Sequence, residues 1–165
     1  MPYPDDLLEQ AWHLAKREKK KPRQASLRRA VSTAYYALFH LLIHEATLNW
    51  RRVDQRGVFA RFFEHGKMRN ASKKQADDLN AFFKTNPPAG HQLDTAQHLH
   101  LVADIFSKAQ EQRHAADYDT AKIWARTDIV GLIERVDSAF KSWQTIREEP
   151  TAQTYLISLL GNPKG

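Results

Sequence analysis

Hydrophobic residues recur at intervals of three and four along most of the chain, and no segment shows a sustained alternation of two. Such intervals place apolar side chains on one face of an α-helix. The clearest example has spacings of four, three, four and three: Ile129, Ile133, Val136, Phe140 and Trp143. The pattern therefore predicts an all-α fold.

Prolines and polar segments divide this pattern into separate helices. We predict helices over about 5–20, 26–48, 54–63 and 93–115, and a further one that Thr127 caps. Residues 64–74 are polar and rich in turn-forming types, so we expect a turn there, then a short helix that ends before the Asn-Pro-Pro break at 86–88. The segment from Ala34 to Ile43 is apolar on nearly every side, which predicts the most buried helix.

The length of 165 residues suits one domain with a sizeable core. We expect a four- to five-helix up-down bundle over about 5–147 and a short apolar tail helix within 150–165, which packs on the body or on a partner. The chain has no cysteine, which excludes disulfides, thiolate catalysis and Cys-ligated zinc and favours the cytoplasm. The N-terminal residues are acidic where a secretory signal is cationic, and the longest apolar stretch is too short for a membrane span, so we expect neither export nor membrane association.

The net charge is +6 with a pI near 9.6, which raises the expectation of a polyanionic partner. Much of this charge lies in one run, which can contact phosphates if it is presented on one face, or can be a solvated helix end and loop. The candidate phosphate-binding residues of the run are Lys16, Arg17, Lys19, Lys20, Lys21, Arg23, Arg28 and Arg29.

The histidines of the apolar helix are a possible metal-binding feature. His40 and His44 share a helix face, a spacing that can bind a metal, but the acidic residues of a zinc-binding motif are absent between them. We expect buried or interface histidines and no metal site. The chain also lacks a glycine-rich phosphate loop, a paired-carboxylate motif and a nucleophile elbow, so we expect no nucleotide cofactor.

The stretch Arg-His-Ala-Ala-Asp-Tyr-Asp at 113–119 lies where the helical pattern of 93–115 stops. Arg113 can bind phosphate in a bidentate manner. It can also form a structural ion-pair network with Asp117 and Asp119, with the Tyr118 ring packed beneath it. In that structural interpretation the network fixes the turn between two helices.

Two stretches together carry a family resemblance. The segment Leu27–Ile43, with its Ala-Tyr-Tyr-Ala-Leu-Phe-His motif, and the later Arg-His-Ala-Ala-Asp-Tyr resemble the small bacterial and archaeal group of HEPN-domain proteins. The resemblance covers about residues 5–147, and Arg56–Phe63 is similar to that group's Gly-Val-x-x-x-Phe segment. It implies a four- or five-helix bundle, a homodimer, and pairing with a minimal nucleotidyltransferase in a toxin–antitoxin-like module. We assign Tyr35, Tyr36 and His40 of the first motif a structural role.

The resemblance also bears on catalysis. Ribonucleases of the HEPN family carry an Arg, four to six residues and then a His, which meet across a dimer cleft and cleave RNA without a metal. Tyr118 stands at that spacing from Arg113, and His114 points about 100° away on a helix. A tyrosine with a pKa of about 10 is a poor base at neutral pH, whereas histidine, at about 6.5, suits the task.

We therefore expect a non-catalytic HEPN-like protein that binds RNA, a nucleotide phosphate or a partner protein through Arg113 and the basic run. The alternative is a metal-independent ribonuclease toxin that uses Arg113 with His114 or another histidine. A plain interaction module is the third possibility. We also expect a homodimer, because the apolar helix and the apolar tail exceed what a small bundle needs to bury.

Overall fold

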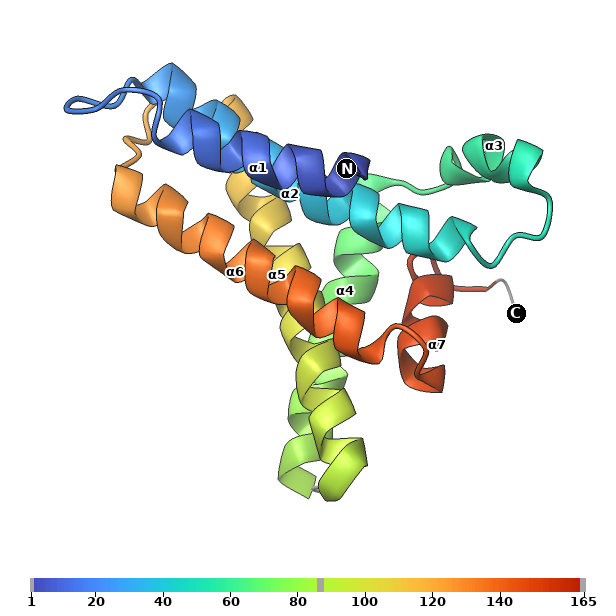
Figure 1. The fold of residues 1–165 in the computed structure, drawn as a ribbon. Coiled ribbons are helices and arrows are strands. Elements are labelled where there is room, and N and C mark those ends of the chain that lie inside the picture. The colour runs from blue at the N-terminus through green and yellow to red at the C-terminus, as the bar shows by residue number, and fades with distance from the viewer. Residues whose placement is uncertain (1, 86–87, 164–165) are drawn as a thin grey trace.

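The computed structural model describes residues 2–85 and 88–163, and this part of the chain forms seven α-helices, one short 3-10 helix and no strand (Figure 1). The all-α prediction is confirmed. The number of helices exceeds the four or five expected. The elements are α1 (Tyr3–Ala15), α2 (Gln24–Thr47), η1 (Val53–Gln55), α3 (Arg56–Ala60), α4 (His65–Thr85), α5 (Gly90–Tyr118), α6 (Arg126–Ile146) and α7 (Pro150–Ser158).

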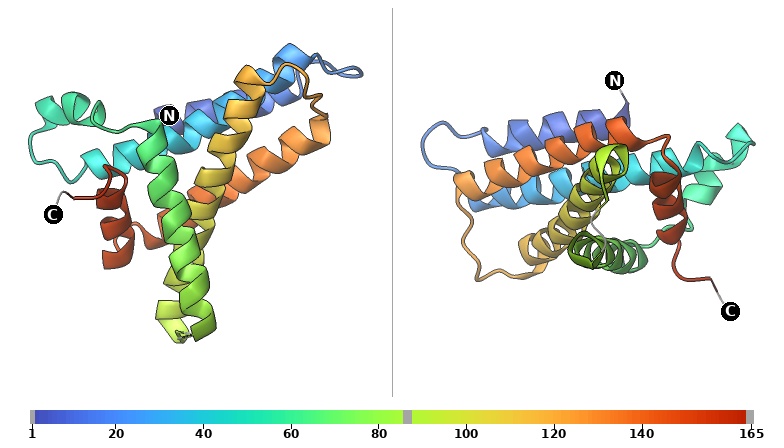
Figure 2. Two further views of the ribbon diagram at one scale, coloured as in Figure 1. Left: turned by 180° about the vertical axis from the view of Figure 1, so that it is seen from behind. Right: turned by 90° about the horizontal axis from the view of Figure 1, so that it is seen from below.

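The helices form a layer and a hairpin that crosses it. In Figure 1, α1, α2 and α6 lie side by side, with α1 antiparallel to α2, and each of the three contacts the other two. Helices α4 and α5 pack together as an antiparallel pair that crosses this layer steeply and extends beyond it (Figures 1 and 2). The arrangement therefore differs from a simple up-down bundle, in which all helices run along one axis.

Helix α2 lies at the centre of the fold, as its apolar pattern predicts. It contacts α1, α3, α5, α6 and α7, and the side chains of Leu27, Ala34, Tyr35, Leu38 and Leu42 are fully buried. A helix that is apolar on nearly every side is stable only when neighbours cover it on nearly every side. The central position of α2 confirms the prediction for Ala34–Ile43.

Helix α6 confirms the clearest periodic pattern. Its five predicted apolar residues are all buried. The helix begins at Arg126, with Ala125 as its N-cap, so the predicted cap at Thr127 is wrong by two positions. Asp128 still lies in the first turn, where a carboxylate favours the positive end of the helix dipole.

Helix α4 corrects the prediction for residues 64–74. The expected turn is instead the first half of a 21-residue helix. Its buried residues Met68, Ser72 and Ala76 recur every fourth position and form a narrow stripe. The stripe is too narrow to be recognised as a helical pattern in the sequence. Packing against α5 outweighs the turn preference of Gly66 and Asn70.

Helix α1 ends at Ala15, five residues before the predicted end, because α6 binds the chain that follows. The Arg126 guanidinium donates hydrogen bonds to the carbonyls of Ala15, Glu18 and Lys19. The guanidinium thus supplies the hydrogen bonds that these carbonyls would otherwise accept from the N–H groups of a further helical turn. Residues 16–23 form a loop that projects from one end of the layer (Figure 1).

The tail folds back onto the same chain. In α7, Ala152, Tyr155 and Leu156 are buried, and the Tyr155 hydroxyl lies 2.7 Å from the Ser72 hydroxyl of α4. Because the tail and α2 are both covered within one chain, the argument for a homodimer from excess apolar surface no longer holds. The homodimer stays a prediction from the resemblance alone.

Two sequence predictions extend beyond the described residues. The Asn-Pro-Pro break includes positions 86 and 87, and the tail includes positions 164 and 165, all of which lie outside the described part of the chain. Within residues 2–85 and 88–163, no helix combines the length and the apolar character that crossing a membrane requires.

Candidate functional site

Arg113 lies inside the fold, where α5 crosses α2. The residue is 9% exposed, and its guanidinium carbon lies 5.2 Å from the centre of the Tyr35 ring and 5.8 Å from that of Tyr36. A guanidinium over tyrosine rings forms a cation–π interaction, which is stronger when water is excluded. The Nη1 atom also lies 3.5 Å from a carboxylate oxygen of Asp117, one turn further along α5.

His65, the first residue of α4, completes this group. Its Nδ1 atom lies 2.6 Å from the Tyr35 hydroxyl, and its ring stacks on Phe39 with centres 4.2 Å apart. Tyr36 meets the same imidazole edge to face at 5.7 Å. We call Tyr35, Tyr36, Phe39, His65 and Arg113 the Arg113 cluster.

The environment favours the neutral form of the histidine. Burial lowers the pKa of His65 below its ordinary value, and the positive charge of Arg113 and the proximity of His40 lower it further. Burial likewise raises the pKa of the Tyr35 hydroxyl, against the opposing effect of Arg113. A neutral imidazole beside a fixed cation is a group that can accept a proton at neutral pH.

His40 borders the cluster as a packing residue. Its ring lies 5.0 Å from that of Tyr3 in α1 and 6.2 Å from that of Tyr36, and burial lowers its pKa. His44, one turn further on, is exposed. In the described part of the chain, no three His, Asp or Glu side chains lie together as a potential metal site.

The structural role expected of residues 117–119 is only partly correct. Asp117 pairs with Arg113 and also accepts a 2.5 Å hydrogen bond from the Ser32 hydroxyl. Asp119 instead accepts from the backbone N–H of Ala121. Tyr118 is 67% exposed, so its ring does not pack beneath an ion-pair network.

His114 is exposed on the outer side of α5. Its ring lies 4.9 Å from that of Tyr118, also on the surface. Arg113, by contrast, faces the interior. Adjacent residues on a helix diverge in this way, so His114 and the Arg113 cluster lie on different sides of α5.

The turn after α5 is fixed by Arg28, a residue that the sequence suggested for phosphate binding. The Arg28 guanidinium donates hydrogen bonds of 2.9 Å to the carbonyls of Ala116 and Asp119 and of 2.6 Å to that of Lys122. Three bonds to one turn hold the cation in place and engage both of its terminal nitrogens. We therefore correct the assignment of Arg28 to a structural role.

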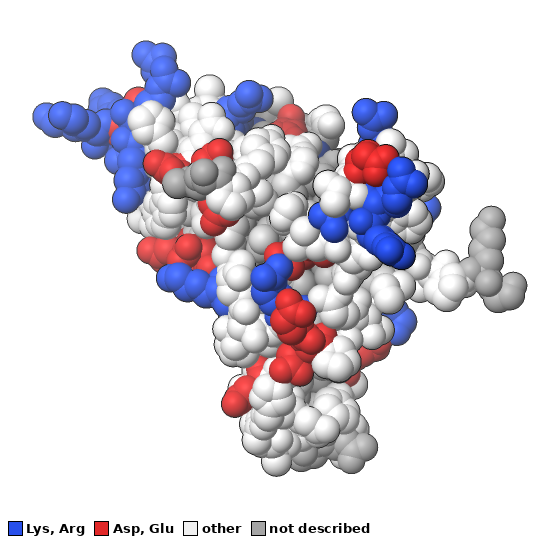
Figure 3. Space-filling view, turned by 45° about the vertical axis from the view of Figure 1, so that its right-hand side comes forward, with Lys and Arg blue, Asp and Glu red and all other residues white. Residues whose placement is uncertain are grey.

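The rest of the basic run gathers at one end of the helical layer. The first residue of α2, directly after the loop 16–23, is joined there to the α5–α6 connection: the Gln24 amide donates to the Trp124 carbonyl and accepts from the Trp124 N–H. Figure 3 shows the resulting concentration of basic side chains at its upper left. We call this surface the basic end; its exposed members are Lys16, Arg17, Lys19, Lys20, Lys21, Arg23, Arg29 and Lys122.

Acidic side chains neutralise little of the basic end. Among the described residues, no ion pair joins any of its members to a carboxylate. Glu18, the one acid within the loop, accepts a 2.7 Å hydrogen bond from the Ser26 hydroxyl, which lowers its pKa. The basic end is therefore a surface of largely uncompensated positive charge.

Sequence reasoning missed His65 as a site residue. It lies in the segment expected to be a turn, and only the four-residue spacing of Met68, Ser72 and Ala76 behind it indicated a helix. That helix brings the imidazole to the Tyr35 hydroxyl. Comparisons with family models, with curated proteins and with solved structures gave no match to this chain.

Proposed function

We propose that this protein is a non-catalytic HEPN-like RNA-binding protein that holds RNA phosphates at the basic end. The observation that carries the proposal is the exposure of eight basic side chains on one surface, none of which pairs with a carboxylate within residues 2–85 and 88–163. Polyanion binding by such a surface is driven by the release of counterions from the nucleic acid. The motifs at Leu27–Ile43 and at 113–118 support the HEPN-like assignment by resemblance.

The loop is preorganised for this role. Arg126 binds three carbonyls within it or next to it, and Gln24, directly after it, is joined to the α5–α6 connection. A loop fixed before binding loses little conformational entropy on association. Lys16 and Lys122 lie over the rings of Trp12 and Trp124. The exposed side chains of Lys19, Lys20 and Lys21 can follow a phosphate backbone without base specificity.

The stretch at 113–119 supports the non-catalytic part of the proposal. Tyr118 stands where the ribonuclease motif has its histidine. The Arg113 guanidinium lies over the rings of Tyr35 and Tyr36 and pairs with the Asp117 carboxylate. Because the Arg113 side chain is nearly buried, we assign phosphate binding to the basic end. A homodimer and a nucleotidyltransferase partner remain expectations that follow from the resemblance.

RNA binding by matched variants tests the proposal. Fluorescence anisotropy with a labelled single-stranded RNA at low salt compares the wild type with two triple variants. Replacing Lys19, Lys20 and Lys21 by alanine removes charge from the basic end, and replacing Lys73, Lys74 and Lys84 removes the same charge from α4. We expect Kd values of about 10⁻⁴ to 10⁻⁶ M for nonspecific binding at physiological salt, tighter binding at low salt, and weakening only in the first variant. Equal effects of the two variants would contradict the proposal.

A second candidate function, metal-independent RNA cleavage, is favoured by one observation. The neutral imidazole of His65 lies beside Arg113, so a base and a phosphate-stabilising cation belong to one cluster. The test is cleavage of mixed RNA in the presence of a chelator. Cleavage abolished by both His65→Gln and Arg113→Lys, in proteins with a native circular dichroism spectrum, would replace the binding function with this one; an inert wild type supports binding alone.

A further inference from the structure

The segment between α2 and α4 forms an arm that projects from the bundle. It comprises residues 48–63 and includes η1 and α3; Figures 1 and 2 show it beyond the end of α2. Most of its large apolar side chains are exposed. Val58 is 58% exposed, Phe62 63% and Trp50 45%, and only Phe63 is buried.

The arm is rigid at its base. The Arg56 guanidinium donates to the carbonyls of Trp50 and Leu48 at 2.9 and 3.2 Å. The Trp50 indole N–H donates to Gln55, and the indole ring stacks on Phe59 with centres 5.3 Å apart. These contacts hold the Trp50 ring in place against Phe59.

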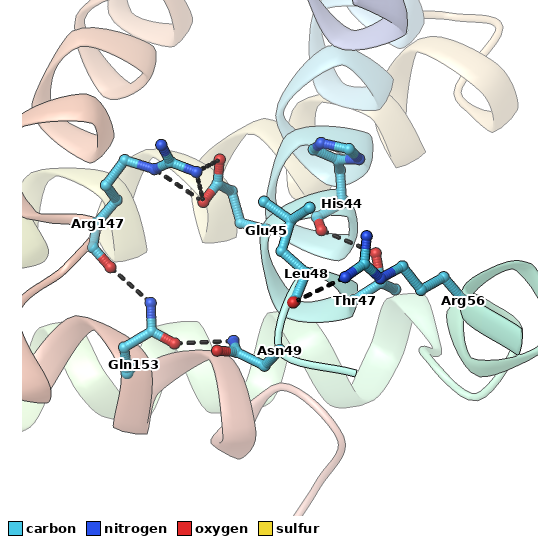
Figure 4. Close-up of polar contacts among 8 residues, drawn as sticks. All are labelled: His44, Glu45, Thr47, Leu48, Asn49, Arg56, Arg147 and Gln153. Carbon is cyan, nitrogen blue, oxygen red and sulfur yellow. Dashed lines mark hydrogen bonds and ion pairs between the residues drawn. The ribbon is translucent and has the colours of Figure 1, made fainter. Parts of the chain in front are cut away.

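A second set of contacts ties the arm to the C-terminal part of the fold (Figure 4). Asn49 donates to the Gln153 side chain at 2.8 Å, and Gln153 donates to the Arg147 carbonyl at 2.6 Å. Arg147 in turn holds both carboxylate oxygens of Glu45. The start of the arm, the end of α2 and α7 are thus one connected unit.

A hollow of about 510 Å³ lies between the arm and α7. Aromatic side chains of the arm and aliphatic side chains of α7 form its apolar walls. Polar atoms at its rim belong to Asn49, Gln153 and Glu148. The lining thus combines rings for stacking with a few hydrogen-bonding groups, the combination that a flat heteroaromatic base requires.

Arginines are interleaved with the exposed rings. Residues 50–63 contain four arginines, at 51, 52, 56 and 61, and one acid, Asp54, which pairs with Arg52 at 3.1 Å. Arg51 and Arg61 are exposed, and neither takes part in an ion pair among the described residues. Figure 3 shows this second concentration of basic atoms at its upper right.

We propose that the arm is a second RNA-binding site, at which bases of a single strand stack on Trp50, which lines the hollow, and on Phe62, which is exposed outside it, while Arg51 and Arg61 bind the flanking phosphates. This inference rests on the proposed function for the class of its ligand, RNA, while the contacts of the arm are separate from those of the basic end. Each nucleotide of a single strand carries one base and one phosphate. The exposed rings can stack on the bases, and the adjacent guanidinium groups can bind the phosphates. A protein partner for this surface would need apolar side chains to cover the rings and, between them, carboxylates to pair with the arginines.

The two sites lie at opposite ends of α2. The helix has 24 residues, so its ends are separated by about 36 Å at a rise of about 1.5 Å per residue. One strand can reach both sites only if it is long enough to span this distance. The account therefore predicts that long strands bind more tightly than short ones, through effective concentration.

The test measures binding of oligouridine of about 4 and about 16 nucleotides, a range typical of single-strand sites. Phe62→Ala and Arg61→Ala alter the arm; Phe82→Ala and Lys84→Ala, at exposed positions of α4, are the matched controls. Tryptophan fluorescence, compared between wild type and Trp50→Phe, reports stacking at Trp50. We expect Phe62→Ala and Arg61→Ala each to weaken binding of the long strand about fivefold or more, and the controls to have no effect.

Each alternative outcome has a distinct meaning. If the lysine variant of the basic end loses affinity while both arm variants bind normally, the proposed function stands and this inference is wrong. If Trp50 is quenched by RNA but the basic-end lysines have no influence, the arm site stands and the basic end does not bind. If the arm variants alter only the sedimentation coefficient of the protein, the arm is an interface between protein copies and the RNA site is refuted.

Discussion

The hydroxyl of Tyr35 lies 2.6 Å from Nδ1 of His65 and joins the central helix α2 to the start of α4. Tyr35 is fully buried, while His65 is partly exposed. The contact therefore connects the core to the surface at the point where Arg113 also enters from α5. A proton on His65 would add a positive charge beside Arg113, in a partly buried site that lowers the pKa of the imidazole.

The first prediction concerns pH. The folded protein holds the pKa of His65 below its ordinary value, whereas the unfolded chain has a histidine pKa of about 6.5. Between these two values the unfolded state binds more protons, so the free energy of unfolding decreases as the pH falls below about 6.5. Urea denaturation between pH 8 and pH 5 measures this decrease.

The matched variants for this measurement are His65→Gln and His114→Gln. We expect His65→Gln to show a smaller loss of stability on acidification than the wild type, because the substitution removes a histidine whose neutral form the folded state favours. His114 is exposed and serves as the control for loss of an imidazole. An unchanged pH dependence in His65→Gln would refute the role of this residue.

The second prediction separates two neighbouring arginines. Arg28→Ala removes three hydrogen bonds from the turn after α5, and we expect a loss of about 2 kcal/mol in the free energy of unfolding. Arg29→Ala changes an exposed side chain, and we expect a change within about 0.5 kcal/mol. Chemical denaturation distinguishes them, and a similar effect of both would show that the Arg28 bonds contribute little.

The third prediction concerns the stretch at 113–119. Arg113→Ala removes a nearly buried cation from two tyrosine rings and leaves Asp117 without its ion pair, so we expect a loss of about 2 kcal/mol or more. Tyr118→Ala should change stability by about 0.5 kcal/mol or less, because the ring is exposed. Thermal denaturation of both variants gives the comparison, and the reverse order would contradict the assigned packing.

Strong periodicity made much of the fold predictable. In α2 and α6 the apolar pattern is dense, and both helices occupy the buried positions that it indicates. In α4 the buried stripe is narrow, and stability comes from packing on α5, which a local pattern does not report. The exposure of the arm's rings is likewise not visible in the sequence, because an exposed ring and a core ring look alike there.

The candidate site was only partly predictable. The basic run is contiguous in sequence, so its exposure at one end of the layer could be anticipated, whereas the binding of three carbonyls by Arg28 depends on a distant turn. The motif at 113–118 identified Arg113 as a candidate residue from the sequence. His65 reaches the same cluster only through the packing of α4, and no local signal indicates a contact between segments so far apart.

The salt dependence of RNA binding tests the central claim most directly. For single strands, each phosphate that a cation neutralises contributes about 0.7 to the slope of log affinity against log salt concentration. We predict a steep negative slope for the wild type, and a slope shallower by up to about 2 when Lys19, Lys20 and Lys21 are replaced by alanine. Identical slopes for the two proteins, or binding that does not respond to salt, would contradict the assignment of RNA phosphates to the basic end.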